Sequence, residues 1–419
     1  MKRPILIAGA LLAATLAGSA SEAGSFLIRN ATVHTMTAAG TQNGADILIT
    51  DGKVTAVGHA LKAPADAQVI DAAGRIVTPG LFGGMSHLGL DEIGLEPTQQ
   101  DYELKLGAMR PEFDVMPAFN PDATSIGVNR VGGVTFAVVA PTPADSQGTI
   151  IAGQGSVVTL DGSVLATSRA LFVDVGADAA ALSGGSRAAQ FMLLRQAFTE
   201  ARTPNLVLNN DQRLLTPLGR QALLEFISGA APFVIDVDRA ADIRQVLAFA
   251  AREKLKIAIS GGAEAWRVAP ELAVAKVPVI LDPLDDLPAN FDDVGATLEN
   301  AARLDKAGVR VAFSFGDPES HNVRKLRQAA GIAVAHGLPW QAGLAAITRV
   351  PAEIFGVADR VGSIETGRPA NLVVWSGDPL EVTSVAEQVF IGGRLQPQTS
   401  RQTELRDRYL ERLRRNAAR

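Results

Sequence analysis

The feature that most constrains the fold is a regular alternation of short apolar runs with longer amphipathic stretches through the middle of the chain. Near-continuous apolar strands that alternate with amphipathic helices indicate a parallel sheet covered by helices. The clearest four strand and helix pairs are 232–238 and 240–253, 256–260 and 263–275, 277–282 and 292–307, and 309–317 and 322–336. This α/β pattern predicts one (β/α)8 TIM barrel over residues 81–355, since such barrels take about 250 residues. A doubly wound open sheet is the alternative, but its glycine fingerprint is missing at the first strand-to-helix turn.

The two ends of the chain have a different, β-rich pattern. Asp51-Gly52 lies between two β-rich runs and is a strong signal for a two-residue hairpin turn. A sheet of about four short strands is rarely stable alone and needs a partner surface. We therefore expect residues 24–80 and 356–398 to form one small discontinuous β-sandwich, with the barrel inserted between them.

The first 23 residues have the pattern of a cleaved signal peptide. A short basic head precedes an apolar run from Ile5 to about Leu16, and small residues follow. The apolar run is shorter than the ~20 residues of a membrane-spanning helix, so we expect no stable membrane insertion. This pattern predicts export to the periplasm or secretion.

Cysteine content and charge exclude disulfide bonds and argue against nucleic acid as a partner. The chain has no cysteine, so it forms no disulfide, and its net charge of −5 has no basic stripe of the kind that binds nucleic acid. The one basic cluster is 399–419, where Leu405, Tyr409 and Leu413 recur every four residues. We expect a terminal helix that packs on its own domain or on a partner; contact with anionic lipid is the alternative.

Two stretches resemble a known family. "RIVTPGLFGGMSHLG", which ends at Gly89, is similar to the first barrel strand of the amidohydrolase superfamily, where Pro-Gly is usually followed by Asp-x-His-x-His. "DRVGSIETGRPANLVVWSGDPL" looks like the segment in which that family's chain returns to the β-sandwich. The resemblance runs from about Phe26 to Leu395 and is closest to an exported branch.

This resemblance implies a barrel with one or two divalent metals at the carboxyl ends of its strands. The family's ligands are two histidines on strand 1, often a carbamylated lysine on strand 4, one histidine each on strands 5 and 6, and an aspartate on strand 8. Such metals generate hydroxide near neutral pH and polarise a carbonyl. The implied reaction is hydrolysis of C–N bonds in amides, cyclic amides or dipeptides.

The ligand positions of this sequence depart from the family pattern. His87 matches the second histidine of strand 1, whereas Met85 replaces the first and offers only a soft thioether. No histidine occurs between His87 and His321, and no lysine between Lys105 and Lys254. Strands 3 to 6 therefore supply neither the carbamylated lysine nor the two imidazoles.

By resemblance, other residues occupy the remaining ligand positions. The strand 5 histidine falls on Asp236 or Asp238, the strand 6 histidine on Gly261, and the strand 4 lysine on Thr159. Asp317 matches the strand 8 aspartate and is retained. Residues at i and i+2 of a strand share a face, so Asp236 and Asp238 are expected side by side.

These matches define a candidate site. Asp317 is the expected catalytic residue, and His87, Asp236 and Asp317 are the expected ligands of at most one divalent metal, Zn, Mn or Mg. The usual dinuclear centre is not expected. His321 and Arg239 are expected to contact a small-molecule substrate or ligand at the barrel mouth.

Three functions fit this degenerate motif set. The protein could be a catalytically silent homologue that forms a hetero-oligomer with an intact paralogue, or a homo-oligomer. It could instead be an active hydrolase with a remodelled mononuclear or metal-free site. The third alternative is a periplasmic small-molecule binding protein.

Overall fold

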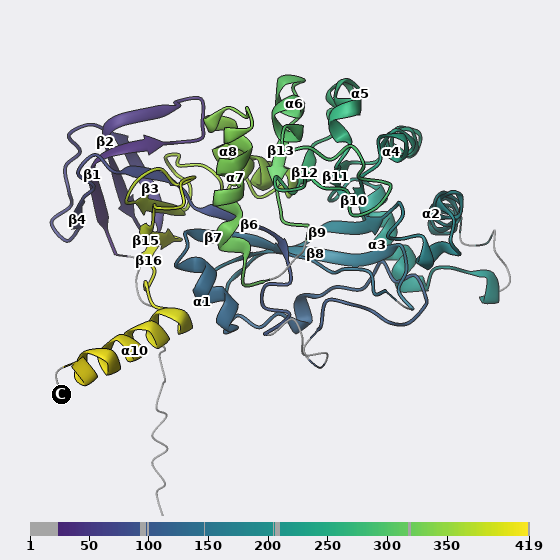
Figure 1. The fold of residues 1–419 in the computed structure, drawn as a ribbon, viewed down its shortest axis with the longest axis horizontal. Coiled ribbons are helices and arrows are strands. Elements are labelled where there is room, and N and C mark those ends of the chain that lie inside the picture. The colour runs from purple at the N-terminus through teal and green to yellow at the C-terminus, as the bar shows by residue number, and fades with distance from the viewer. Residues whose placement is uncertain are drawn as a thin grey trace, which may run out of the picture.

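Two eight-stranded sheets organise the chain in the computed structural model (Figure 1). The structure describes residues 24–92, 98, 100–145, 147–203, 205, 210–316 and 320–417. The signal peptide expected at 1–23 lies outside these residues, and so does Asp317.

The first sheet joins the two ends of the chain. Strand β5 pairs in parallel with β1 and antiparallel with β14, so it connects the N-terminal strands to the C-terminal ones. The predicted hairpin is confirmed, because β2 and β3 pair antiparallel around Asp51-Gly52. The strands are β1 Phe26–His34, β2 Thr41–Thr50, β3 Lys53–Gly58, β4 Gln68–Asp71, β5 Ile76–Pro79, β14 Leu372–Trp375, β15 Ala386–Ile391 and β16 Arg394–Leu395.

The second sheet is a nearly closed barrel. Its order runs without interruption from β13 to β6, and the backbone N–H of Met85 on β6 donates to Ser314 Oγ, just beyond β13, at 2.9 Å. The α/β class is confirmed. The strands are β6 Leu81–Ser86, β7 Val134–Val139, β8 Ile151–Thr159, β9 Val164–Asp174, β10 Phe233–Val237, β11 Ile257–Gly261, β12 Val279–Leu281 and β13 Val311–Phe313.

Alternating side chains sort the barrel residues into an inner and an outer set. On β10, Val234 belongs to the inner apolar cluster, while Ile235 belongs to the outer cluster that packs against the helices. The inner cluster takes one or more residues from every strand: Phe82, Phe136, Val138, Ala152, Val157, Ala170, Phe172, Val234, Ala258, Ile280 and Ala312. The barrel is therefore filled, and any site must lie at one of its ends.

Strand β8 departs from the expected alternation of strand and helix. It pairs antiparallel with both β7 and β9, whereas all the other neighbours in this sheet are parallel. The turn from β8 to β9 contains Asp161-Gly162, with φ of 89° at the glycine. This short hairpin leaves no room for a crossover helix, so β8 runs opposite to the other seven strands.

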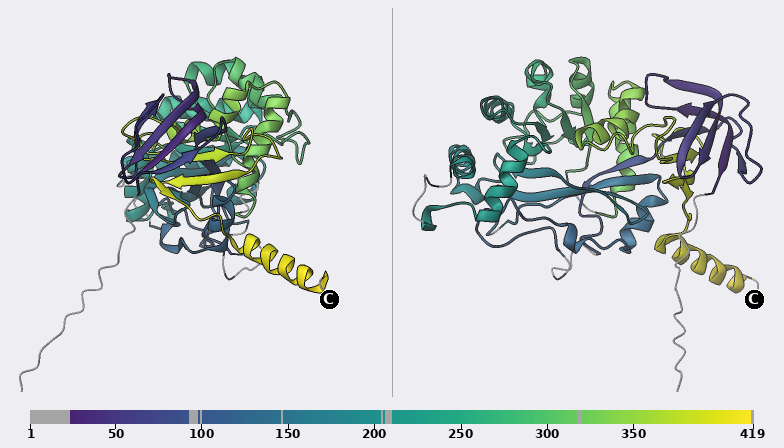
Figure 2. Two further views of the ribbon diagram at one scale, coloured as in Figure 1. Left: turned by 90° about the vertical axis from the view of Figure 1, so that its left-hand side faces the viewer. Right: turned by 180° about the vertical axis from the view of Figure 1, so that it is seen from behind.

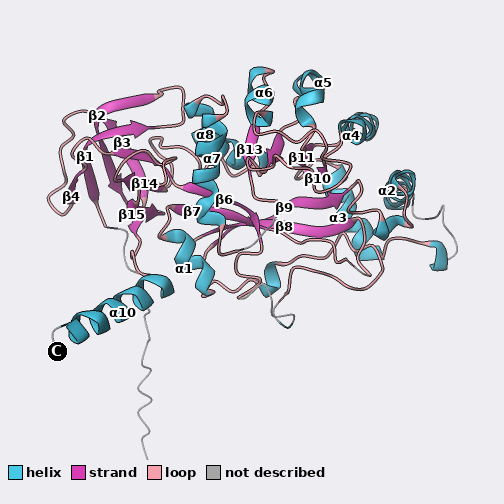
Figure 3. Cartoon of the chain, in the orientation of Figure 1, coloured by secondary structure: helices cyan, strands magenta, loops and turns pink. Residues whose placement is uncertain are grey.

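Helices cover the outside of the barrel beside β10 to β13 (Figures 1 and 3). The helix predicted at 292–307 is shorter than expected and begins at Asn300. At the start of the predicted range, Asp293 accepts hydrogen bonds from the backbone N–H groups of Ala289 and Asn290, which holds residues 289–293 in turns. None of the described helices is both long and apolar enough to cross a membrane. The helices are α1 Thr124–Arg130, α2 Arg187–Arg202, α3 Pro217–Ile227, α4 Ala240–Glu253, α5 Ala269–Ala275, α6 Asn300–Lys306, α7 Leu326–Ala335, α8 Trp340–Ala346, α9 Arg349–Ile354 and α10 Arg401–Ala417.

Helix α10 leaves the body of the molecule (Figures 1 and 2). It contacts α1, and of its residues 401–416, for which burial is described, only Thr403 and Leu405 are partly covered. The rest of the helix projects away from both sheets.

Candidate functional site

A cavity of about 580 Å³ opens at the carboxyl ends of the barrel strands. Ligand sites of α/β barrels lie at this end, because the loops that follow the strands converge there. Its lining combines an apolar wall with a row of carboxylates: Met85, His87, Ala140, Pro141, Thr142, Pro143, Phe172, Asp174, Asp178, Val234, Asp236, Asp238, Ser260, Gly261, Ile280, Asp282, Leu284, Asp285, Ala289, Ser314, Phe315 and Gly316.

The side of the cavity next to β6 is apolar and neutral. Met85 lines it, and the ring of His87 stacks on Tyr102 with the ring centroids 3.4 Å apart and the planes at 6°. His87 Nε2 is hydrogen-bonded to Thr142 Oγ1 at 2.8 Å. Burial lowers the pKa of His87 to about 3, so the imidazole is neutral. One ring nitrogen and one ring face of this histidine are thus already engaged by protein groups.

The opposite side carries a pair of aspartates. Asp174 ends β9 and Asp236 lies in register beside it on β10, on strands about 4.8 Å apart. Both side chains face the cavity. Burial raises the pKa of both carboxyls; the charge of Asp236 raises that of Asp174 further, while a hydrogen bond with Ser260 lowers that of Asp236. Two neighbouring desolvated carboxyls cannot both ionise easily, so the ionisation of one disfavours the ionisation of the other.

Asp238 extends this acidic wall, as the i and i+2 spacing predicts. Burial, followed by the charge of Asp236, raises its pKa to about 7, although the backbone N–H of Ala263 donates to its Oδ1 at 3.1 Å. Gly261 lies opposite with φ of 73°, and a Cβ placed there would be 2.6 Å from Asp238 Oδ1. The backbone at the strand 6 position is therefore shaped for glycine and closely approached by Asp238.

The donors of this cavity do not fit the family's metal centre. Within the described residues, no group of three or more His, Asp or Glu side chains converges as metal ligands do. His87 is engaged by Thr142, and Met85 and Gly261 supply no imidazole at their positions. We therefore derive no step through a metal.

The structure places the sequence-predicted site residues as follows. His87 and Asp236 line one cavity, whereas Arg239 and His321 are not among its lining residues. Arg239 instead donates two hydrogen bonds to Asp242, at 2.9 and 2.8 Å. Asp317, expected as catalytic residue and ligand, lies outside the described residues.

The alignment of Thr159 with the strand 4 lysine is wrong. Thr159 ends the reversed strand β8 and pairs with Phe136 near the start of β7, at the amino end of the barrel. Asp174 occupies the carboxyl end of β9, next to Asp236, and is the residue that sequence reasoning missed. Its signal was an apolar run, "ALFVD", that ends in aspartate as "VIDVD" does.

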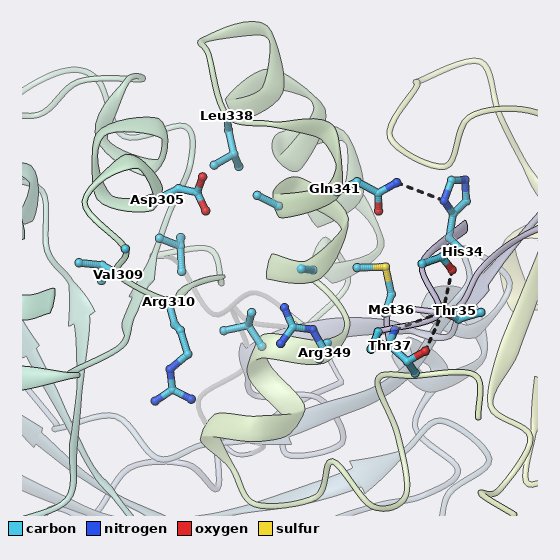
Figure 4. A pocket seen from close by; sticks show the side chains of 17 residues that line it. His34, Thr35, Met36, Thr37, Asp305, Val309, Arg310, Leu338, Gln341 and Arg349 are labelled. Atoms are coloured by element: carbon cyan, nitrogen blue, oxygen red, sulfur yellow. Dashed lines mark hydrogen bonds between the residues drawn. The ribbon is translucent and has the colours of Figure 1, made fainter. Parts of the chain in front are cut away.

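A second cavity, of about 590 Å³, lies at the other end of β13 (Figure 4). Residues 34–38 and 40, helix α8 and helix α9 contribute to its lining, and several of its polar groups have protein partners. His34 Nδ1 is hydrogen-bonded to Thr41 Oγ1 at 2.9 Å, and Arg349 donates to Glu353 at 2.7 Å. The carboxyl-end cavity is the better site, because its carboxyl pair is desolvated and faces open space.

Comparison with known proteins places this geometry in a family. Residues 243–397 match the model of the amidohydrolase family. A solved amidohydrolase from Thermotoga maritima MSB8 is 28% identical with a TM-score of 0.79, and the alignment covers 89% of this chain and 100% of that one.

Two curated relatives match over part of their length. The amidohydrolase tasK of Hapsidospora irregularis is 24% identical over 390 residues, 84% of this chain and 40% of that protein. A dihydroorotase of Geotalea daltonii is 37% identical over 111 residues, 25% of this chain and 26% of that protein. The chain thus spans less than half the length of these relatives. The family match, the solved structure and these relatives together show that the chain has amidohydrolase homologues and structural neighbours in the amidohydrolase superfamily.

Proposed function

We propose that this protein binds a small organic molecule at the barrel mouth and that a carboxyl pair replaces the superfamily's metal centre. The observation that carries the proposal is the in-register pair Asp174 and Asp236, which faces a cavity of about 580 Å³. The engaged ring of His87 and the glycine backbone at Gly261 support it further.

The chemistry of the pair indicates the class of ligand. A protonated carboxyl donates a hydrogen bond and its ionised neighbour accepts one, so together they match a group such as an amide, which offers an acceptor and a donor. Phe172, Val234 and Ile280 add an apolar wall beside the pair. We therefore expect a neutral amide or cyclic amide with an apolar body, which agrees with the superfamily's C–N substrates.

Metal-free hydrolysis of such a ligand is the second candidate, favoured by the raised pKa values of the two carboxyls. The ionised carboxylate would take a proton from water as general base, and the protonated carboxyl would donate to the carbonyl oxygen as the hydroxyl adds. Collapse of the adduct with proton transfer to nitrogen would release an amine and a carboxylic acid. Without this step, the protein is the silent homologue or binding protein of the sequence hypotheses.

The scaffold and setting belong to the same proposal. We assign the scaffold as a TIM barrel with one reversed strand, accompanied by a β-sandwich built on the terminal sheet; the fold of the Thermotoga amidohydrolase supports this. Export by a signal peptide and pairing with an intact paralogue remain expectations from the sequence.

Three measurements on one preparation test the function. Metal content is measured after purification without chelators, binding is followed by thermal shift with a panel of amides and cyclic amides, and hydrolysis of each hit is assayed. We expect metal far below one ion per chain, and a stabilising amide whose effect Asp236→Asn abolishes and Asp305→Asn, in the other cavity, leaves intact. One tightly bound divalent ion per chain, lost together with ligand binding on chelation, would contradict the proposal.

A further inference from the structure

Helix α10 carries an exposed apolar stripe with a basic border. Leu405, Tyr409 and Leu413 follow one another at the four-residue spacing that keeps side chains on one face of a helix, and Leu410 lies beside them. We call these four residues the α10 stripe. Tyr409 and Leu413 are 58% and 64% exposed, so the projecting part of the stripe is uncovered in the single chain.

The charges of α10 are segregated around this stripe. Six arginines and three acidic residues occur between 401 and 417. At 3.6 residues per turn, Arg401, Arg408 and Arg412 follow one edge of the stripe. Arg406 lies between Leu413 and Leu410 and pairs with Asp407. The acidic residues Glu404, Asp407 and Glu411 lie on the face away from it. The stripe therefore suits a surface that is apolar and acidic.

Such a surface exists at the rim of the barrel-mouth cavity. The loop of residues 283–294, here called the mouth loop, contains four aspartates and no lysine or arginine. It exposes four apolar side chains, with Leu287 at 74% and Phe291 at 91%. The exposed apolar residues of the mouth loop are Leu284, Leu287, Phe291 and Val294. A cluster of large apolar side chains this exposed is typical of an interaction surface.

The mouth loop also has unneutralised negative charge. Asp292 pairs with Arg187 and Arg239, but no described lysine or arginine forms an ion pair with Asp285 or Asp286. Burial, and then the charges of Asp293 and other neighbouring aspartates, raise the pKa of Asp285 to about 6. Arginines brought to this loop would relieve that repulsion.

We propose that the α10 stripe of one copy of this chain docks on the mouth loop of a second copy. The two surfaces match in both apolar character and charge, and α10 already projects from the body toward solvent (Figures 1 and 2). A 17-residue helix is about 25 Å long and is only marginally stable when it has no partner.

Other occupants fit these observations less well. Two α10 stripes placed face to face would bring their arginine borders together. An anionic bilayer would attract α10 but repel the rest of the chain, because the whole chain is at −5 although α10 itself is basic. A helix-to-loop contact joins two different surfaces, so it is heterologous and builds a ring or an open chain of copies.

Light scattering of the full chain over a range of concentrations tests the docking, with surface variants of each half. We expect wild type to self-associate. Leu413→Glu on the α10 stripe and Phe291→Glu on the mouth loop should each weaken association by at least about tenfold. Val274→Glu, at an exposed apolar residue of α5, and Asp407→Asn on the far face of α10 should leave it unchanged. Thermal unfolding and circular dichroism verify that all the variants remain folded.

Mixing the two defective variants gives the sharpest result. The Leu413→Glu protein keeps an intact mouth loop and the Phe291→Glu protein keeps an intact α10, so their mixture should form 1:1 dimers. A wild-type monomer at all concentrations would overturn the proposal, as would association that Phe291→Glu leaves unchanged. Monomeric protein that sediments with vesicles containing anionic phospholipid through Leu413 would assign α10 to a lipid surface instead.

Discussion

The two sides of the barrel mouth have opposite chemistry. On the β6 side, His87 is neutral, stacked on Tyr102 and hydrogen-bonded to Thr142. On the β9 and β10 side, Asp174 and Asp236 crowd together with raised pKa values and face open space. The histidine side has become part of the packed wall, whereas the carboxylate side stores electrostatic repulsion that a ligand can relieve. Retaining one family residue therefore says little about retaining its role.

Among these variants, a histidine introduced at Gly261 should lower the free energy of unfolding most. Gly261→His requires a left-handed conformation and displaces Asp238, so we expect a loss of about 2–4 kcal/mol of unfolding free energy. Gly261→Asn, which tolerates positive φ better, should lose less than half of this. Chemical denaturation measures both, and equal stability of wild type and Gly261→His would show that the backbone does not exclude the family's ligand.

Removing the histidine ring tests whether the β6 side is a packed wall. His87→Ala loses the stack on Tyr102 and the hydrogen bond to Thr142, for an expected cost of about 2–3 kcal/mol. His87→Phe keeps an aromatic ring and should cost about 1 kcal/mol. If both variants have the same unfolding free energy as wild type, His87 has no structural role, and the result would favour its interpretation as a metal ligand.

The acidic side predicts a pH dependence of the opposite sign to ordinary acid denaturation. A carboxyl whose folded pKa is raised loses stability when it ionises, so stability should rise as the pH falls from about 8 to about 6, through the pKa of about 7 for Asp238. We expect a gain of a few degrees in the thermal midpoint. Asp238→Asn should flatten this rise, while Asp407→Asn, at an exposed carboxyl whose pKa is lowered by its hydrogen bond with Arg406, should not. A midpoint that falls over the same range would contradict the crowding of carboxyls.

Restoring the first histidine of the strand 1 motif should have the smallest effect. Met85→His places a second imidazole on the β6 side, but His87 remains bonded to Thr142 and stacked on Tyr102. We therefore expect the zinc content of the variant to stay far below one ion per chain. One zinc ion per chain in this single variant would mean that the loss of one ligand, at Met85, is enough to explain the loss of metal binding.

Local signals predicted much of the fold. The α/β class, the Asp51-Gly52 hairpin and the strands that precede α4 to α7 follow from turn residues and hydrophobic periodicity. Asp161-Gly162 was the same kind of hairpin signal and would have revealed the reversed β8, but it lies inside a stretch interpreted as strand and helix repeats. A strong local turn signal should therefore take precedence over the expected repeat.

The site could be predicted only in part. The positions of lysine and histidine in the sequence exclude a carbamylated lysine and two imidazoles on strands 3 to 6. Strand alternation places Asp236 and Asp238 together. The pairing of Asp174 with Asp236 depends on the register of two strands whose paired residues are 62 positions apart (236 − 174), which no local pattern encodes. The orientation of His87 likewise depends on Tyr102 and Thr142, which approach it from loops distant in sequence.

The pairing of β5 with β14 has a consequence for how the chain folds. Val77 and Val374 lie opposite each other although almost the whole barrel separates them in sequence. Closing so long a loop carries an entropic cost, and folds rich in such distant pairings form slowly. During synthesis, the N-terminal strands of this sheet are complete long before their C-terminal neighbours exist, which leaves the β5 edge open to other strands. The barrel must therefore form quickly enough to bring the two ends together before that edge pairs elsewhere.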